Sequence, residues 1–317
     1  MGKIIRIGTR ESQLAVWQAT LVQGLLKKAG FTSELVYIKS EGDVDLKTPL
    51  YEMGVQGVFT RSLDVALINN RIDIAVHSMK DVPTQLPVGI IQAAVLKRGH
   101  VNDLLVFKNK ISSEKYSSLT THHSFTVATS SIRRKAQWLN KFPNHQIENL
   151  RGNVNTRLRK LQEENWDAAI FAQAGLERIN LRPENSVVLD WMLPAPAQGA
   201  IMAVCREDDK FSFEACEHFN DAETALSTKI ERGFLRTLLG GCSTPISALA
   251  EIKNDKVYFK GNILSLDGSK KVEIEKSIFI KEANGLGEKA AHELLNKGGK
   301  EIADSIRKSN VSLNDEV

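Results

Sequence analysis

Arginine and lysine are concentrated in one short part of this chain. Between residues 133 and 160 there are eight basic residues and a single acid, Glu148, so this stretch carries +7. The whole chain of 317 residues has a formal net charge of +4, and subtracting seven leaves −3 on the remainder. Five of the eight are arginines, whose planar guanidinium pairs in a bidentate manner with carboxylate or phosphate. Two interpretations are open: a solvated basic face, which is the usual origin of such runs, and an anion-binding cleft.

Basic and hydroxyl side chains recur at three expected strand–helix junctions. Free backbone N–H groups at a helix N-terminus attract anions, and arginines add charge-assisted contacts. Each junction alone has an ordinary explanation as a helix cap, but an α/β fold brings the carboxyl ends of its strands to one cleft. Together they predict a site for several carboxylates or phosphates. The residues are Arg10 and Ser12 at the first junction, Thr129, Ser130, Ser131, Arg133 and Arg134 at the second, and Arg151, Gly152, Asn153 and Arg157 at the third.

Two further candidate functional residues, Lys80 and Asp81, follow an almost wholly apolar strand that ends at His77. Lys80 offers an ammonium for an anion, and Asp81 offers a carboxylate for a developing cation. A capped turn before Pro83 is the alternative, and this fragment alone does not decide between them. His77 has the side chain of a general base, although a single histidine that closes an apolar strand is more often packed and hydrogen-bonded.

Cysteine chemistry is possible at one position. Cys242 follows Gly240 and Gly241, and glycines allow a tight backbone that exposes a thiol. A buried cysteine in a glycine turn is the favoured interpretation without other information. The scattered cysteines make no disulfide framework, which predicts a reducing, cytoplasmic location. No histidine pair has helical spacing and no phosphate-binding loop is present, so neither a metal site nor a nucleotide site is expected.

The elements that must position these residues alternate along the chain. This alternation predicts βαβ units, and the change to consecutive strands near the C-terminus predicts a separate α+β domain. Residues 40–57 are predicted to form a long mobile loop. The predicted strands cover 4–8, 34–39, 72–77, 90–96, 104–107, 125–128, 146–149, 168–171, the apolar run 199–205, 246–252, 257–263 and 271–280. The predicted helices cover 12–28, capped by Ser12, then 58–70, 131–141, 153–163, 211–219, 222–239 and one long helix over 285–307.

Seven segments together resemble one family, hydroxymethylbilane synthase, also called porphobilinogen deaminase. They occur in family order over residues 4–250, and they read IRIGTRESQLAVWQA, DIAVHSMKDVPT, ATSSIRRKAQW, LRGNVNTRLRKL, DAAIFAQAGLERI, LPAPAQGAI and GGCSTPI. The resemblance implies a transferase of tetrapyrrole and haem biosynthesis. Such an enzyme links four porphobilinogen molecules head to tail with release of ammonia, and then hydrolyses the chain to 1-hydroxymethylbilane.

The resemblance also implies a role for each matching residue. A covalent dipyrromethane cofactor would be attached through Cys242, and Asp81 would be catalytic by stabilising the positive azafulvene-like species formed on deamination. Cofactor-binding residues would be Ser78, Lys80, Thr129, Ser131, Arg133, Arg134, Arg151 and Gly152. Substrate-binding residues would be Arg10, Ser12, Ser130, Arg151, Arg157, Arg178 and Gln198. Where many members have glycine, this chain has Ala128, Asn155 and Ala197.

The family fold implies an α/β protein with two lobes like those of type II periplasmic binding proteins, plus a C-terminal α+β domain. Domain 1 would comprise residues 1–100 and 196–217, domain 2 residues 101–195, and domain 3 residues 218–317. The expected partner is porphobilinogen, with no nucleic acid and no membrane, and the expected state is a monomer. A non-catalytic binder of a small polyanion would leave Asp81 and Cys242 idle. A nucleic-acid binder using residues 133–160 would have only Trp138 and Phe142 as interleaved aromatic residues, which is few for stacking on bases.

Overall fold

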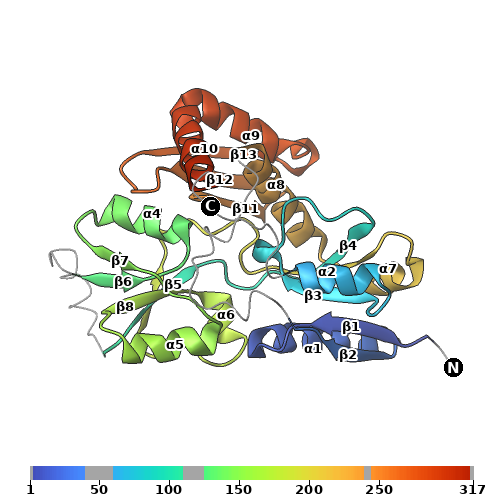
Figure 1. The fold of residues 1–317 in the computed structure, drawn as a ribbon. Coiled ribbons are helices and arrows are strands. Elements are labelled where there is room, and N and C mark those ends of the chain that lie inside the picture. The colour runs from blue at the N-terminus through green and yellow to red at the C-terminus, as the bar shows by residue number, and fades with distance from the viewer. Residues whose placement is uncertain (1–2, 40–59, 110–124, 239–243, 315–317) are drawn as a thin grey trace.

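The computed structural model describes residues 3–39, 60–109, 125–238 and 244–314, with side chains described up to residue 308. Figure 1 shows two lobes side by side and a third body, coloured orange to red, that rests on both. Each lobe contains a five-stranded sheet, and the third body contains a three-stranded sheet. The predicted α/β class with a C-terminal α+β domain is therefore confirmed. The loop predicted over residues 40–57 and the candidate Cys242 lie outside the described residues.

The first lobe holds a sheet in the order β2-β1-β3-β10-β4. Strand β1 pairs in parallel with both β2 and β3, so their carboxyl ends lie at one edge. Strand β10 runs antiparallel between β3 and β4, so the chain returns to this sheet after the strands of the second lobe. The elements are β1 (Ile5–Thr9), α1 (Gln13–Lys28), β2 (Ser33–Tyr37), α2 (Arg61–Ile68), β3 (Ile74–Ser78), β4 (Ile90–Val95), β10 (Ile201–Arg206) and α7 (Lys210–Glu217).

The second lobe repeats this plan with the order β7-β6-β8-β5-β9. Strand β6 is parallel to β7 and β8, so a second set of carboxyl ends meets at one edge. Short helix α6 and edge strand β9 were not predicted. The elements are β5 (Asp103–Phe107), β6 (Thr126–Ala128), α4 (Ile132–Lys141), β7 (Gln146–Glu148), α5 (Val154–Glu163), β8 (Ala168–Ala172), α6 (Gln173–Glu177) and β9 (Ser186–Leu189).

The C-terminal body packs helices on one face of an antiparallel sheet. At Gly261 an added Cβ would lie 2.6 Å from Cζ of Phe234, so helix and strand approach closely there. The single helix predicted over residues 285–307 is wrong: Gly298, with φ of 104°, breaks it inside a turn over Leu295–Gly299. The elements are α8 (Ala222–Leu238), β11 (Ile246–Lys253), β12 (Lys256–Leu264), β13 (Lys271–Phe279), α9 (Leu286–Leu294) and α10 (Lys300–Asn314).

Two crossing segments connect the lobes, residues 96–102 and 190–200. The N–H of Gly99 donates to the carbonyl of Gly199 over 3.0 Å. Gly199 has φ of 85°, and a Cβ there would lie 2.8 Å from the carbonyl oxygens of Gly99 and His100. The two segments can lie this close only because Gly199 lacks a side chain. A direct contact between the lobes is added by Asn155, whose Nδ2 donates to Oε1 of Gln13 over 3.0 Å.

Candidate functional site

Strand β3 ends in a short 3-10 turn, Met79–Asp81, which carries Lys80 and Asp81. Met79 is buried in the lobe core, and its N–H donates to the carbonyl of Ala200 over 3.0 Å. Lys80 and Asp81 remain half-buried at the edge of the sheet. Ser78 precedes the turn and accepts a hydrogen bond from Nε2 of Gln18 at 2.8 Å. We call residues Ser78–Pro83 the catalytic turn.

The arginine pair at the start of α4 converges on a buried carboxylate. Ser131 caps helix α4, and the first turn of this helix carries Arg133 and Arg134, which are both buried. Nη2 of Arg133 lies 2.6 Å from Oδ2 of Asp103, and Nη2 of Arg134 lies 2.7 Å from Oδ1. Carbonyl oxygens of Leu193 and Ile170 accept further bonds from the two guanidinium groups.

Asp103 is the main residue that the sequence analysis missed. It is fully buried at the first position of β5. Burial alone would raise its pKa, but the charges of Arg133 and Arg134 outweigh burial and hold the pKa well below its usual range. The only signal in the sequence was an acid directly before the apolar run Leu104–Phe107, which by itself predicts no function.

Gln198 connects the catalytic turn to Asp103. Its Oε1 accepts from Nζ of Lys80 at 3.2 Å, and its Nε2 donates to Oδ1 of Asp103 at 2.9 Å. Burial and the charge of Arg134 lower the pKa of Lys80 to about 8, although Asp81 and Asp103 act in the opposite direction. Groups from both lobes therefore share one electrostatic site.

The third junction faces the same site. Gly152 has φ of 112°, and a Cβ there would lie 2.6 Å from Cγ2 of Thr156. The carbonyl of Gly152 accepts from Nε of Arg157 at 2.7 Å, and Arg151 is buried beside it in the chain. Burial and the charge of Arg134 lower the pKa of Arg157 to about 10, while Asp81 raises it. Arg157 in α5 thus lies within electrostatic reach of Asp81 in the other lobe.

The first junction is arranged differently from the prediction. Ser12 occupies the N-cap position of α1, but its side chain makes no capping hydrogen bond, so the predicted cap is wrong in that respect. Arg10 lies within electrostatic reach of His77. Burial and the charge of Arg10 lower the pKa of His77 to about 3, so this imidazole is neutral at physiological pH. His77 is packed, as expected, although its Nε2 has no hydrogen-bond partner.

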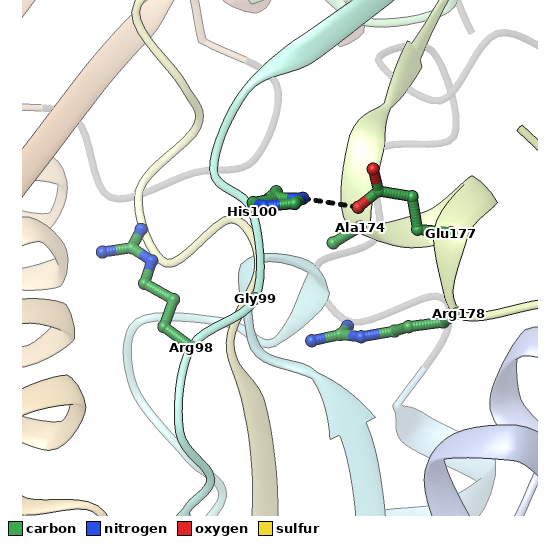
Figure 2. A pocket seen from close by; sticks show the side chains of 6 residues that line it. All are labelled: Arg98, Gly99, His100, Ala174, Glu177 and Arg178. Atoms are coloured by element: carbon green, nitrogen blue, oxygen red, sulfur yellow. Dashed lines mark hydrogen bonds and ion pairs between the residues drawn. The ribbon is translucent and has the colours of Figure 1, made fainter.

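Arg178 contacts the second crossing segment and does not pair with Asp103. Its Nη2 donates to the carbonyl of Gly199 at 2.6 Å, and its guanidinium lies 5.7 Å from the ring centroid of Trp17. Burial lowers its pKa to about 10. Arg178 lines a pocket of about 360 Å³. In the same pocket Nδ1 of His100 lies 2.5 Å from Oε2 of Glu177, and Figure 2 shows the arrangement of these side chains.

The basic stretch contains both buried and exposed side chains. Arg133, Arg134 and Arg151 are buried toward the site, whereas Lys135 and Lys141 are exposed. Arg159 is also exposed and pairs with Glu163 on the same helix face. The exposed members form a solvated basic face, and the buried arginines are the candidates for anion binding.

The predicted site holds a surplus of positive charge. The seven predicted cations, set against the carboxylates of Asp81 and Asp103, leave five positive charges, which suits a ligand with several carboxylates. The cations are Arg10, Lys80, Arg133, Arg134, Arg151, Arg157 and Arg178, and the carboxylates are Asp81 and Asp103. Hydroxyls for further hydrogen bonds are supplied by Thr129, Ser130 and Ser131, which precede α4. Among the described residues no group of three or more metal-ligating side chains occurs, and no helix has the length and apolar content needed to cross a bilayer.

Known proteins resemble this chain over nearly its whole length. Residues 5–214 match the family model "Porphobilinogen deaminase, dipyromethane cofactor binding domain", and residues 225–296 match "Porphobilinogen deaminase, C-terminal domain". A porphobilinogen deaminase of Desulforamulus reducens is 39% identical over 307 residues, which cover 96% of this chain and 98% of that protein. One of Chlorobium phaeobacteroides is 39% identical over 317 residues, covering 98% and 100%. Among solved structures, a nutrient binding protein from Burkholderia cenocepacia bound to methionine is 15% identical and covers 69% of this chain and 93% of its own, with a TM-score of 0.43.

Proposed function

The chain belongs to the porphobilinogen deaminase family, a family of transferases with a dipyrromethane cofactor, and from this premise we propose which residues carry the reaction. The observation that carries the proposal is the meeting of Lys80 and Asp81 from the first lobe with Arg134 and Arg157 from the second. A carboxylate faces a group of fixed cations there. This combination suits a substrate with negative side groups whose reacting centre becomes positive.

Asp81 is the catalytic residue of this proposal. As a carboxylate it accepts hydrogen bonds from pyrrole N–H groups, and its charge opposes the positive charge that develops when ammonia leaves. When bound, the cofactor supplies the nucleophilic pyrrole carbon that starts the chain, and Cys242 holds it through a thioether. Burial and the charge of Arg10 lower the pKa of His77 and make its imidazole a weak base, so this proposal assigns no proton transfer to it.

The cations hold the acetate and propionate groups. Arg133 and Arg134 use part of their donors on Asp103, so they present a fixed edge to a ligand without rotating freely. A guanidinium pairs with a carboxylate through two parallel hydrogen bonds, which fixes the orientation of each pyrrole. The cofactor is assigned to Ser78, Lys80, Thr129, Ser131, Arg133, Arg134, Arg151 and Gly152. The substrate is assigned to Arg10, Ser12, Ser130, Arg151, Arg157, Arg178 and Gln198.

The division of the chain is part of the same proposal. Domain 1 comprises residues 1–100 and 196–217, domain 2 residues 101–195 and domain 3 residues 218–317. The return of β10 to the first sheet supports the discontinuous first domain. The enzyme acts as a monomer in the cytoplasm on porphobilinogen and without nucleic acid. The free, buried thiols of Cys205 and Cys216 suit a reducing compartment.

Intact-protein mass spectrometry combined with a porphobilinogen consumption assay tests this function. We expect the wild-type protein to carry a dipyrromethane adduct that Cys242→Ser removes and the control Cys216→Ala retains. We expect Asp81→Asn, which removes the charge at nearly constant shape, to reduce kcat by roughly 100-fold or more. Wild-type turnover by an unmodified protein would refute the mechanism, and normal turnover by Asp81→Asn would refute the role of Asp81.

A further inference from the structure

Arg232 of the C-terminal body holds the backbone of the catalytic turn. It lies on α8 and is half-buried. Its Nη1 donates to the carbonyl of Val82 at 2.9 Å and to that of Met79 at 3.3 Å, and its Nη2 donates to the carbonyl of Pro83 at 2.5 Å. One guanidinium therefore binds three carbonyl oxygens of a segment about 150 positions away in the sequence.

The three carbonyl groups lie on both sides of Lys80 and Asp81. Met79 precedes these residues, and Val82 and Pro83 follow them. Restraining the backbone before and after Asp81 limits the positions that its carboxylate can take. A guanidinium suits this task because its rigid fork of donors spans several acceptors, whereas an ammonium is a compact point charge.

Helix α8 is itself fixed by the residue next to Arg232. The carboxylate of Glu231 is fully buried and accepts from Nη1 of Arg98 at 2.6 Å and from Nη2 at 2.9 Å. It also accepts from the N–H groups of Ala197 at 2.6 Å and Ala250 at 2.8 Å. The side chain of Arg232 therefore projects from a helix that is tied to both crossing segments and to the C-terminal sheet.

We propose that Arg232 is a positioning residue, through which the position of α8 determines the position of the Asp81 carboxylate. In the sequence Cys242 follows four residues after the end of α8 at Leu238, so one helix leads to the proposed cofactor attachment and also restrains the proposed catalytic carboxylate. This inference rests on the proposed role of Asp81. Arg232 acts on the backbone of the turn, and its loss displaces Asp81 without removing a binding group.

Steady-state kinetics of the holoenzyme test the inference. For Arg232→Gln we expect kcat to fall roughly 10- to 100-fold, since misplacing a catalytic group by about 1 Å has effects of this size. We expect KM for porphobilinogen to stay within about threefold, because no ligand contact is lost. Arg232→Lys should restore part of the rate, because its ammonium is a charged donor group but lacks the planar fork that spans several carbonyl groups. The control Arg236→Gln lies one turn further on α8, where Arg236 is exposed and pairs with Glu288, and it should match the wild type.

Thermal unfolding and intact mass accompany each assay, so that rates refer to folded protein carrying the adduct. A wild-type kcat in Arg232→Gln overturns the inference. A raised KM with unchanged kcat also overturns it, because Arg232 would then bind ligand directly. A rate loss explained wholly by unfolded or adduct-free protein overturns it as well. Normal turnover by Asp81→Asn would refute the proposed function itself, whereas an inactive Asp81→Asn beside a fully active Arg232→Gln would refute only the coupling.

Discussion

At the scale of single residues, the site depends on charges that are buried together. Lys80 has its ammonium near the guanidinium of Arg134 and near the carboxylates of Asp81 and Asp103. Gln198 joins it to Asp103 by hydrogen bonds. Without a ligand the cations outnumber the carboxylates, so the buried ammonium lowers the stability of the folded protein. A ligand with carboxylates would relieve this cost, which links binding to the protonation of Lys80.

The pH dependence of stability measures that cost. Burial and Arg134 lower the pKa of Lys80 from 10.5 to about 8. Between these values the unfolded chain binds the proton more strongly than the folded protein does, so stability rises as pH rises through this window, and the cost is complete below it. The free energy of unfolding in urea is measured in the cofactor-free Cys242→Ser protein, with Lys80 or with Lys80→Gln. As pH rises from below 8 to above 10.5, the protein with Lys80 should gain on the order of 3 kcal/mol relative to the protein with Lys80→Gln. A difference that is flat or falls across the window would contradict this.

At the scale of elements, the sequence predicted the strands and helices more successfully than their interruptions. Capping residues such as Asn153, whose Oδ1 accepts from the N–H of Thr156, are local signals and mark the start of α5 correctly. Asp103 could not be recognised, because its role depends on Arg133 and Arg134, which are 30 and 31 residues away in the chain. Likewise, α6 is too short for helical periodicity to predict it. Residues that act through tertiary partners carry no local pattern.

The break between α9 and α10 depends on the backbone conformation of Gly298. Gly298 has φ of 104°, and a Cβ there would meet only Cγ2 of Val272 at 4.0 Å. A side chain at this position is therefore disfavoured by the backbone conformation and not by lack of space. We expect Gly298→Ala to lower the free energy of unfolding by about 1–2 kcal/mol. The matched change Gly24→Ala lies inside α1, where a Cβ meets no atom within 4 Å, and it should raise stability by about 0.5–1 kcal/mol. Urea unfolding of both variants checks the opposite signs, and effects of the same sign would contradict this account.

At the scale of the whole molecule, one buried carboxylate joins the C-terminal body to both segments that cross between the lobes. Glu231 receives Arg98 from the first crossing segment, the N–H of Ala197 from the second and the N–H of Ala250 from the C-terminal sheet. Ala197 has φ of 61°, so the chain accepts an unfavourable backbone conformation at this junction. Arg232 and the hydrogen bond from Nε2 of Gln137 to Oγ of Ser247 also join the C-terminal body to the lobes. Glu231 adds a fully buried charge that binds both crossing segments, so we expect its loss to weaken the coupling between the bodies.

Replacing Glu231 tests this cooperativity. Glu231→Gln leaves the guanidinium of Arg98 without its buried countercharge, which should lower stability by about 3–5 kcal/mol.

The four tryptophans, Trp17, Trp138, Trp166 and Trp191, all precede residue 218, so their fluorescence reports on the lobes, whereas far-ultraviolet circular dichroism reports on the whole chain. In the wild type both signals should change at the same urea concentration. In Glu231→Gln the circular dichroism should begin to change at a lower urea concentration than the tryptophan fluorescence, because the C-terminal body unfolds before the lobes. Glu275→Gln, which breaks an exposed pair with Lys260, should leave both transitions in place, and coincident, unshifted transitions in Glu231→Gln would show that the junction does not couple the bodies.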